Sequence, residues 1–134
     1  DAQESRGLGD VYKRQVLDIL NNGKDVAVVD SSIEAHMLDL LIYRENAKLP
    51  QAGAHEYQIA GKSCLAGDIF GDARFDRPLA VGDRISVQDA AGYTMVKKNW
   101  FNGVAMPAIC IRETDGTITV QRTFGYDDYR ASLS

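Results

Sequence analysis

Val16-Leu-Asp-Ile-Leu-Asn-Asn-Gly-Lys-Asp-Val-Ala-Val-Val29 is the stretch on which the prediction of the fold depends. It contains two short apolar runs, at 16–20 and 26–29, and the five residues between them include two Asn and one Gly. Two apolar runs separated by turn-forming residues are typical of a strand, a turn and a second strand. The sequence therefore predicts a β-hairpin here.

The rest of the chain continues in short segments. Residues 32–43 carry apolar side chains at a helix-like spacing, which fits a short helix or an irregular crossing segment equally well, and residues 47–55 have the composition of a loop. Further strands are predicted at 56–60, 83–87, 106–111 and 117–121. Short strands bounded by Gly or Pro, with one weak helical segment, favour a mainly β fold, either a barrel or a sandwich, over a parallel α/β sheet.

The composition restricts the possible partners. A length of 134 residues suits one domain with a single small core. The formal net charge of -4 and the pI near 5.1 argue against a nucleic-acid-binding surface, which needs clustered Lys and Arg. No apolar run approaches the roughly 18–20 residues that span a bilayer. We therefore expect no nucleic acid, no membrane insertion and a cytoplasmic location.

The two cysteines, Cys64 and Cys110, show neither CxxC spacing nor a histidine at a metal-ligand spacing. The sequence therefore predicts no metal site. A disulfide between the two cysteines stays open.

Three short blocks are weak signals one by one but specific in their order and spacing. They are Ser63-Cys-Leu-Ala-Gly-Asp68, Leu79-Ala-Val-Gly-Asp-Arg-Ile85 and Gly92-Tyr-Thr-Met-Val-Lys97, the last leading into Trp100-Phe-Asn-Gly103. In this order they resemble the fold-type III pyridoxal-phosphate-dependent decarboxylases, a family that includes ornithine, diaminopimelate and carboxynorspermidine decarboxylases. The resemblance runs from about Val16 to Ser134 and is greatest to the carboxynorspermidine (carboxyspermidine) branch.

The resemblance implies the fold, the cofactor and the partners. In this family an N-terminal α/β barrel holds pyridoxal 5'-phosphate on a lysine, a C-terminal β-barrel domain with Greek-key-like connections follows, and two subunits share each active site. Residues 16–134 would be that C-terminal domain, with the α/β barrel and the Schiff-base lysine missing. The implied activity is the decarboxylation of a carboxylated polyamine in spermidine biosynthesis by a homodimer. We expect this chain alone to be inactive.

Residues 1–15 differ from the rest of the chain. They show no clear apolar period, and Ser5-Arg-Gly-Leu-Gly-Asp-Val-Tyr-Lys-Arg-Gln15 resembles a translated sequencing-adapter remnant. We therefore predict a non-native segment at 1–15, with a natural linker as the alternative, and assign it no chemistry.

Cys64 is the residue predicted to carry the chemistry. In the family the cysteine of this motif reaches across the dimer interface, where a thiol is a suitable acid for protonating the carbon that has lost carbon dioxide. A buried, inert thiol is the alternative. Leu65 stands where ornithine and diaminopimelate enzymes generally carry an acidic residue, so the resemblance implies a longer and more apolar substrate arm.

Four other residues receive roles from the resemblance. Asp30 stands where related enzymes place an aspartate that faces the substrate amine, and its alternative is a turn or cap at the end of a strand. His36 is a candidate on the substrate side, with a structural histidine as the alternative, and Asp68 is assigned either to substrate binding or to holding the cysteine loop. Tyr93 matches the tyrosine whose hydroxyl binds the cofactor phosphate, with a core tyrosine as the alternative.

Three aromatic and amide residues complete the assignment. Asn102 is expected to shape the turn behind Tyr93, and Trp100 and Phe101 are expected to pack.

Two other functions stay open: another basic amino-acid decarboxylase of the same fold type, or a non-catalytic β-barrel that binds a ligand. Leu65 counts against the first, and burial of Cys64 would favour the second.

Overall fold

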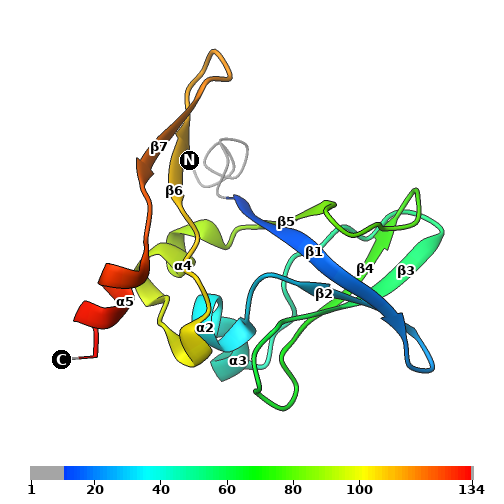
Figure 1. Ribbon diagram of the computed structural model, residues 1–134. Coiled ribbons are helices and arrows are strands. Elements are labelled where there is room, and N and C mark those ends of the chain that lie inside the picture. Colours follow the sequence, from blue (N-terminus) through cyan, green and yellow to red (C-terminus); the bar gives the residue numbers. More distant parts are fainter. Residues whose placement is uncertain (1–10, 134) are drawn as a thin grey trace.

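The computed structural model describes residues 11–133, and its centre is a five-stranded sheet (Figure 1). The strand order is β4-β3-β2-β1-β5; β2 and β3 are parallel and the other neighbours are antiparallel. The strands of this sheet are β1 (Val11–Asn21), β2 (Asp25–Val29), β3 (His55–Ala60), β4 (Ile69–Phe75) and β5 (Arg84–Gln88). A second sheet is the hairpin of β6 (Ile109–Arg112) and β7 (Ile118–Arg122), which extends away from the first sheet in Figure 1.

The helices are short and lie outside the sheet. They are α2 (Ile33–His36), α3 (Leu38–Tyr43), α4 (Ala91–Lys97) and α5 (Tyr126–Ala131), with a 3-10 turn η1 (Phe101–Gly103). Because parallel strands need a long crossover, the chain passes through α2 and α3 between β2 and β3. No helix in residues 11–133 is long and apolar enough to cross a membrane.

The two edges of the curled sheet are joined by the segment that follows α3. Lys48 pairs with Gln88 of β5, and Gln51 pairs with Arg74 of β4. The amide of Gln88 donates to the carbonyl of Lys48 at 3.1 Å, and the amide of Arg74 donates to the carbonyl of Pro50 at 2.8 Å. The sheet is therefore closed into a barrel, and the predicted mainly β fold is confirmed.

The predicted hairpin is present as β1 and β2, with Ile19 opposite Ala27 and a bulge between Val16 and Asp18. The strands expected at 56–60, 83–87, 106–111 and 117–121 correspond to β3, β5, β6 and β7, with shifts of at most three residues at their ends. The ambiguous segment 32–43 consists of two short helices, α2 and α3.

The sequence analysis predicted neither β4 nor the helices α4 and α5. In β4 the central Gly71 has φ 137, and glycine inside a strand weakens the apolar alternation by which strands are recognised. The helices α4 and α5 have seven and six residues, too few for a helical period to show in the sequence. The expectation of a single weak helical segment was therefore wrong.

The barrel interior is filled by side chains. Phe70, Ile59 and Val16 are at most 2% exposed, and a cavity lined by residues of all five strands and by Leu49 is about 10 Å3. The core consists of Tyr12, Val16, Ala27, Val29, Ile33, Met37, Ala47, Leu49, Tyr57, Ile59, Phe70, Ala73, Ile85 and Val87. A space of that size holds at most one water molecule, so this cavity is too small for a cofactor or a substrate.

Residues 11–15, which we expected to lie outside the domain, form the first half of β1. They pair with β5 from Val11 opposite Gln88 to Gln15 opposite Arg84. Tyr12 is 4% exposed and belongs to the core. Residues 11–15 thus form part of a strand, through their pairing with β5, although their sequence shows no clear apolar period. The non-native origin of residues 1–15 stays a prediction, and residues 1–10 lie outside the described part.

A small polar cluster is buried at one end of the core. The Nδ1 atom of His36 lies 2.7 Å from the hydroxyl of Tyr12 and 2.8 Å from that of Ser31. Burial, together with the positive charges of Arg14 and Lys62, lowers the pKa of His36 to about 3. The imidazole is therefore neutral at ordinary pH, and its Nδ1 can accept a hydrogen bond from one of the two hydroxyls, whose oxygens lie 2.6 Å apart.

This cluster predicts that the chain loses stability in mild acid. In the unfolded state His36 binds a proton below its ordinary pKa of 6.5, whereas in the folded state it binds one only below a pKa of about 3. Between these two pH values the unfolded state binds more protons, so the free energy of unfolding decreases as the pH falls. The linkage removes about 2 kcal/mol of unfolding free energy between roughly pH 7 and pH 5. His36→Asn, which keeps a polar group without titrating there, is expected to lose this part of the pH dependence in urea unfolding. His55→Asn is the control, and an unchanged pH dependence in His36→Asn would contradict the prediction.

Candidate active site

The loop between β3 and β4 carries Cys64. Its base is closed by the amide of Gly61, which donates to the carbonyl of Asp68 at 2.7 Å. The amide of Lys62 donates to the carbonyl of Ser31 at 2.8 Å, which ties the loop to the end of β2. Cys64 is exposed and its thiol is free. The two ends of the loop are therefore held by backbone hydrogen bonds, and the Cys64 thiol between them is exposed at the surface.

Asp68 joins this loop to the N-terminus of α2. Its carboxylate, in a residue that is 6% exposed, accepts from the amide of Ile33 at 2.7 Å and from the amide of Ser63 at 3.0 Å, and the Ser63 hydroxyl donates to it as well. A side chain at Gly61 would place a Cβ 2.3 Å from this carboxylate, so the position needs glycine. These contacts fit the role of holding the cysteine loop, while direct substrate binding by Asp68 stays a prediction.

The C-terminal carbonyls of α2 hold the segment that carries Tyr93. The hydroxyl of buried Thr94 donates to the carbonyl of His36 at 2.7 Å. The backbone amide of Asn99 donates to the carbonyl of Ala35 at 2.8 Å, and its side-chain amide donates to the carbonyl of Glu34 at 3.2 Å. Helix α4 and the residues after it are thus attached to the same short helix whose first amide, that of Ile33, binds Asp68.

Tyr93 lies on the outer face of α4. Its side chain is 57% exposed, and the Lys97 ammonium lies 4.9 Å from the centre of its ring. Tyr93 is therefore not a core tyrosine. An exposed phenol beside an ammonium is a donor set that suits an anionic group such as a phosphate.

Asp30 and His36 have different surroundings. The Asp30 carboxylate, 30% exposed, forms an ion pair with Arg14 at 2.9 Å and accepts from the amide of Gln15 at 2.8 Å. A substrate ammonium at Asp30 would compete with Arg14. His36 is 1% exposed and bonded within the polar cluster described above, which fits a structural histidine; its role on the substrate side stays a prediction.

The sequence analysis did not connect Asn102 with the cysteine. In the structure the Oδ1 atom of Asn102 accepts from the amide of Cys64 at 2.9 Å. Asn102 has φ 57, a left-handed conformation that asparagine adopts more readily than most residues. The Phe-Asn-Gly sequence signals such a turn, but no local pattern can indicate a partner 38 residues away.

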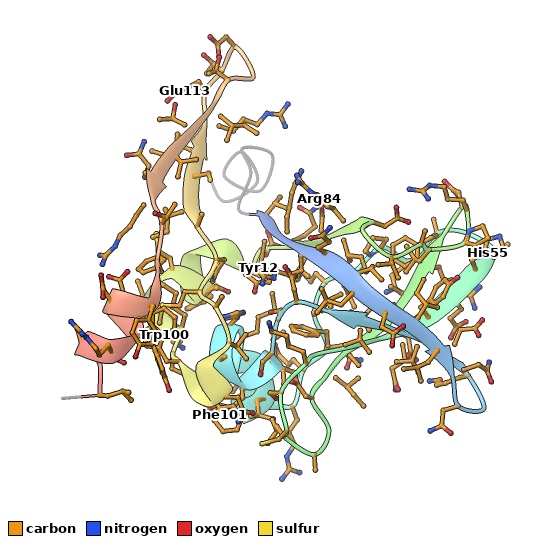
Figure 2. The ribbon with its side chains drawn as sticks, viewed as in Figure 1. Tyr12, His55, Arg84, Trp100, Phe101 and Glu113 are labelled. Atoms are coloured by element: carbon orange, nitrogen blue, oxygen red, sulfur yellow. The ribbon has the colours of Figure 1, made fainter. Side chains whose placement is uncertain are left out.

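The aromatic residues beside Asn102 pack as expected. The ring centre of Trp100 lies 5.6 Å from that of Tyr129 in α5, and Figure 2 shows Trp100 beside that helix. Phe101 is half-buried. Between residues 11 and 133, no group of three or more His, Cys, Asp or Glu side chains could hold a metal ion.

Known proteins match most of the chain. The family described as "Pyridoxal-dependent decarboxylase, C-terminal sheet domain" matches residues 11–91, a range that begins inside the segment we predict to be non-native. The carboxynorspermidine/carboxyspermidine decarboxylase of Herminiimonas arsenicoxydans is 68% identical over 120 residues, which cover 89% of this chain and 33% of that protein. The carboxyaminopropylagmatine decarboxylase of Synechocystis is 50% identical over 113 residues, covering 80% of this chain and 29% of that protein.

The structural comparison agrees with the sequence matches. The crystal structure of carboxynorspermidine decarboxylase from Campylobacter jejuni, complexed with norspermidine, superposes with a TM-score of 0.83 at 31% identity and covers 90% of this chain and 37% of that one. This chain spans about a third of the length of the curated relatives it matches. The resemblance drawn from the three sequence blocks is confirmed: the chain belongs to the pyridoxal-dependent decarboxylase family and contains its C-terminal sheet domain.

Proposed function

We propose that the complete protein is a pyridoxal-phosphate-dependent decarboxylase that converts carboxynorspermidine or carboxyspermidine to the corresponding polyamine. The observation that carries this proposal is the 68% identity to a relative of that name over 120 residues. This chain contributes the C-terminal sheet domain of a cytoplasmic homodimer in which two subunits share each site. Pyridoxal phosphate, when bound, supplies the electron sink that makes loss of carbon dioxide possible.

Cys64 is proposed to supply the proton that the reaction needs. When the bond to the carboxylate breaks, carbon dioxide leaves and the electron pair stays on the substrate carbon. That carbon then takes a proton from the thiol, and the thiolate regains one from solvent. Support comes from the exposure of Cys64 on a loop whose base is fixed by Asp68 and Gly61. A cysteine inside the barrel could not reach a neighbouring subunit.

Tyr93 is proposed to bind the cofactor phosphate, and Asp30 is proposed to bind an ammonium group of the substrate. The exposed hydroxyl of Tyr93 would donate to the cofactor phosphate, with Lys97 adding positive charge. Asp30 would bind a substrate ammonium; it is close to the cysteine loop because Ser31, the next residue, accepts from the amide of Lys62. Its pairing with Arg14 opposes this role in the present chain.

Leu65 supports a polyamine rather than a short amino-acid substrate. Its side chain is half-buried and packs against the barrel core, so it places no carboxylate beside the thiol. A second candidate is the decarboxylation of carboxyaminopropylagmatine, favoured by the 50% identity to the Synechocystis enzyme. The solved diaminopimelate decarboxylases, at 21% identity, share the fold alone.

A chimera tests the substrate class. It joins the part of the Herminiimonas arsenicoxydans relative that precedes the matched region to residues 16–134 of this chain, so that the predicted non-native segment is left out. Release of carbon dioxide is measured with carboxynorspermidine, carboxyspermidine, carboxyaminopropylagmatine, diaminopimelate and ornithine at equal concentrations. We expect the first two to give the highest kcat/KM. Preference for ornithine or diaminopimelate would refute the proposal, and preference for carboxyaminopropylagmatine would establish the second candidate.

Replacing the thiol tests the proposed acid. Cys64→Ala in the chimera is expected to lower kcat by about 100-fold or more, the usual contribution of a positioned acid, and to leave the cofactor absorbance intact. Cys110→Ala, which removes the other exposed cysteine, on β6, is the matched control and should keep the parent rate. Parental turnover in Cys64→Ala would show that another group supplies the proton.

Replacing one phenol tests the proposed phosphate contact. Tyr93→Phe is expected to weaken cofactor binding by about 10- to 100-fold, since a hydrogen bond to a charged group contributes roughly 1.5–3 kcal/mol. The measurement is the cofactor dissociation constant from equilibrium dialysis. Tyr126→Phe, at an exposed position of α5, is the control. A dissociation constant that is the same in all three proteins would refute the contact.

A further inference from the structure

The backbone amides of two successive residues in the cysteine loop, Ser63 and Cys64, donate to side chains of other residues. The amide of Ser63 donates to Asp68, and the amide of Cys64 donates to Oδ1 of Asn102 at 2.9 Å. Asp68 belongs to the far end of the same loop, whereas Asn102 belongs to η1, 38 residues farther along the chain. The cysteine is therefore attached to the domain from two directions.

Both attachments have a common support in α2. On one side, the Asp68 carboxylate accepts from the amide of Ile33. On the other side, Asn99 binds the carbonyl of Ala35 and its Oδ1 accepts from the amide of Phe101 at 2.8 Å, which fixes the start of the turn that presents Asn102. The turn is completed by the amide of Gly103, which donates to the carbonyl of Trp100 at 2.8 Å.

These bonds restrict the direction in which the thiol points. A peptide unit is planar, and the amides on both sides of Cys64 are held: that of Cys64 by Asn102, and that of Leu65 by the Ser63 hydroxyl oxygen at 3.3 Å, which itself donates to Asp68. The peptide planes before and after Cys64 are therefore fixed. The direction of its Cα–Cβ bond follows from those planes, which leaves the sulfur mainly the staggered choices of one rotatable bond. The hydrogen bond between Cys64 and Asn102 lies at the exposed surface, where water can replace the asparagine. We therefore expect Asn102 to affect the orientation of the cysteine more than the stability of the domain.

We propose that Asn102 is a positioning residue for the Cys64 thiol: its Oδ1 holds the Cys64 amide and, with the Ser63 hydroxyl on the following peptide unit, sets the direction of the thiol. This inference rests on the proposed function, because the orientation matters to the reaction only if the thiol is the acid. Proton transfer demands a defined donor geometry, and small misplacements of a reacting group lower rates strongly.

Two substitutions separate the side chain from the backbone conformation. Asn102→Gly removes the acceptor and keeps a residue that tolerates φ 57. Asn102→Asp keeps an oxygen at the same place on a side chain of the same shape. Asn22→Gly, in the exposed turn between β1 and β2, is the control for loss of an asparagine. All variants are made in the chimera, and Asn102→Ser, whose hydroxyl is too short to reach, replaces the glycine variant should that protein not fold.

Hydrogen exchange at the Cys64 amide reports on the contact without any turnover. We expect Asn102→Gly to exchange there faster by about tenfold or more, and Asn102→Asp to stay within about threefold of the parent. Asn22→Gly should leave this amide unchanged. Equal exchange in the glycine variant and the parent would overturn the proposal, whatever the activity.

Turnover then shows whether the contact serves the reaction. We expect Asn102→Gly to lower kcat by about 10- to 100-fold with KM and cofactor affinity within about twofold of the parent, and Asn102→Asp to recover most of the rate. In a Cys64→Ala background the glycine substitution should have no further effect, since it acts through the thiol. Faster exchange with unchanged kcat, or full additivity with Cys64→Ala, would overturn the positioning role. Parental turnover in Cys64→Ala alone would instead refute the thiol acid, while the exchange result would still decide whether Asn102 holds the loop.

Discussion

The backbone groups at the two ends of α2 determine the arrangement of the candidate site. A helix of four residues leaves most of its N–H and C=O groups without partners inside the helix, and buried groups of this kind need partners elsewhere. Asp68 accepts from the Ile33 amide, while Asn99 and Thr94 donate to the carbonyls of the last residues. Because these partners belong to the cysteine loop and to the segment around α4, one short helix places three distant parts of the chain in a defined relation.

The barrel supports this arrangement. Its interior is filled by side chains such as Phe70 and Ile59, and the closing segment at Lys48 and Gln51 joins its two edges. A filled and closed barrel is a rigid scaffold, and loops at its rim can then hold reactive side chains in place. Helix α2 lies at that rim because it begins at Ile33, directly after β2 ends at Val29. The parallel pairing of β2 with β3 then requires a long connection, and the segment containing Lys48 and Gln51 returns the chain to the start of β3.

Much of the fold and part of the site could be predicted from the sequence, for reasons visible in particular residues. The hairpin of β1 and β2 has strong local signals, and the blocks around Cys64 and Tyr93 are specific enough to identify the family. Strand β4 was missed because Gly71 interrupts its alternation, and α4 because seven residues are too few for a period. The ordered place of Tyr12 in the core was missed because it depends on pairing with β5.

The sequence by itself determined the mainly β class and the family, because both follow from short contiguous motifs. The roles of Cys64 and Tyr93, which the same motifs imply, stay proposals. Only the tertiary structure decided what surrounds them: that His36 is buried and neutral, that Asp30 meets Arg14, and that Asn102 reaches the Cys64 amide. Each of these facts depends on residues far apart in the chain, whose contact is produced by the closure of the sheet and the crossover through α2. Local sequence patterns do not indicate such contacts. The burial of His36, the pairing of Asp30 with Arg14 and the orientation of the Cys64 thiol therefore follow from the folded structure alone.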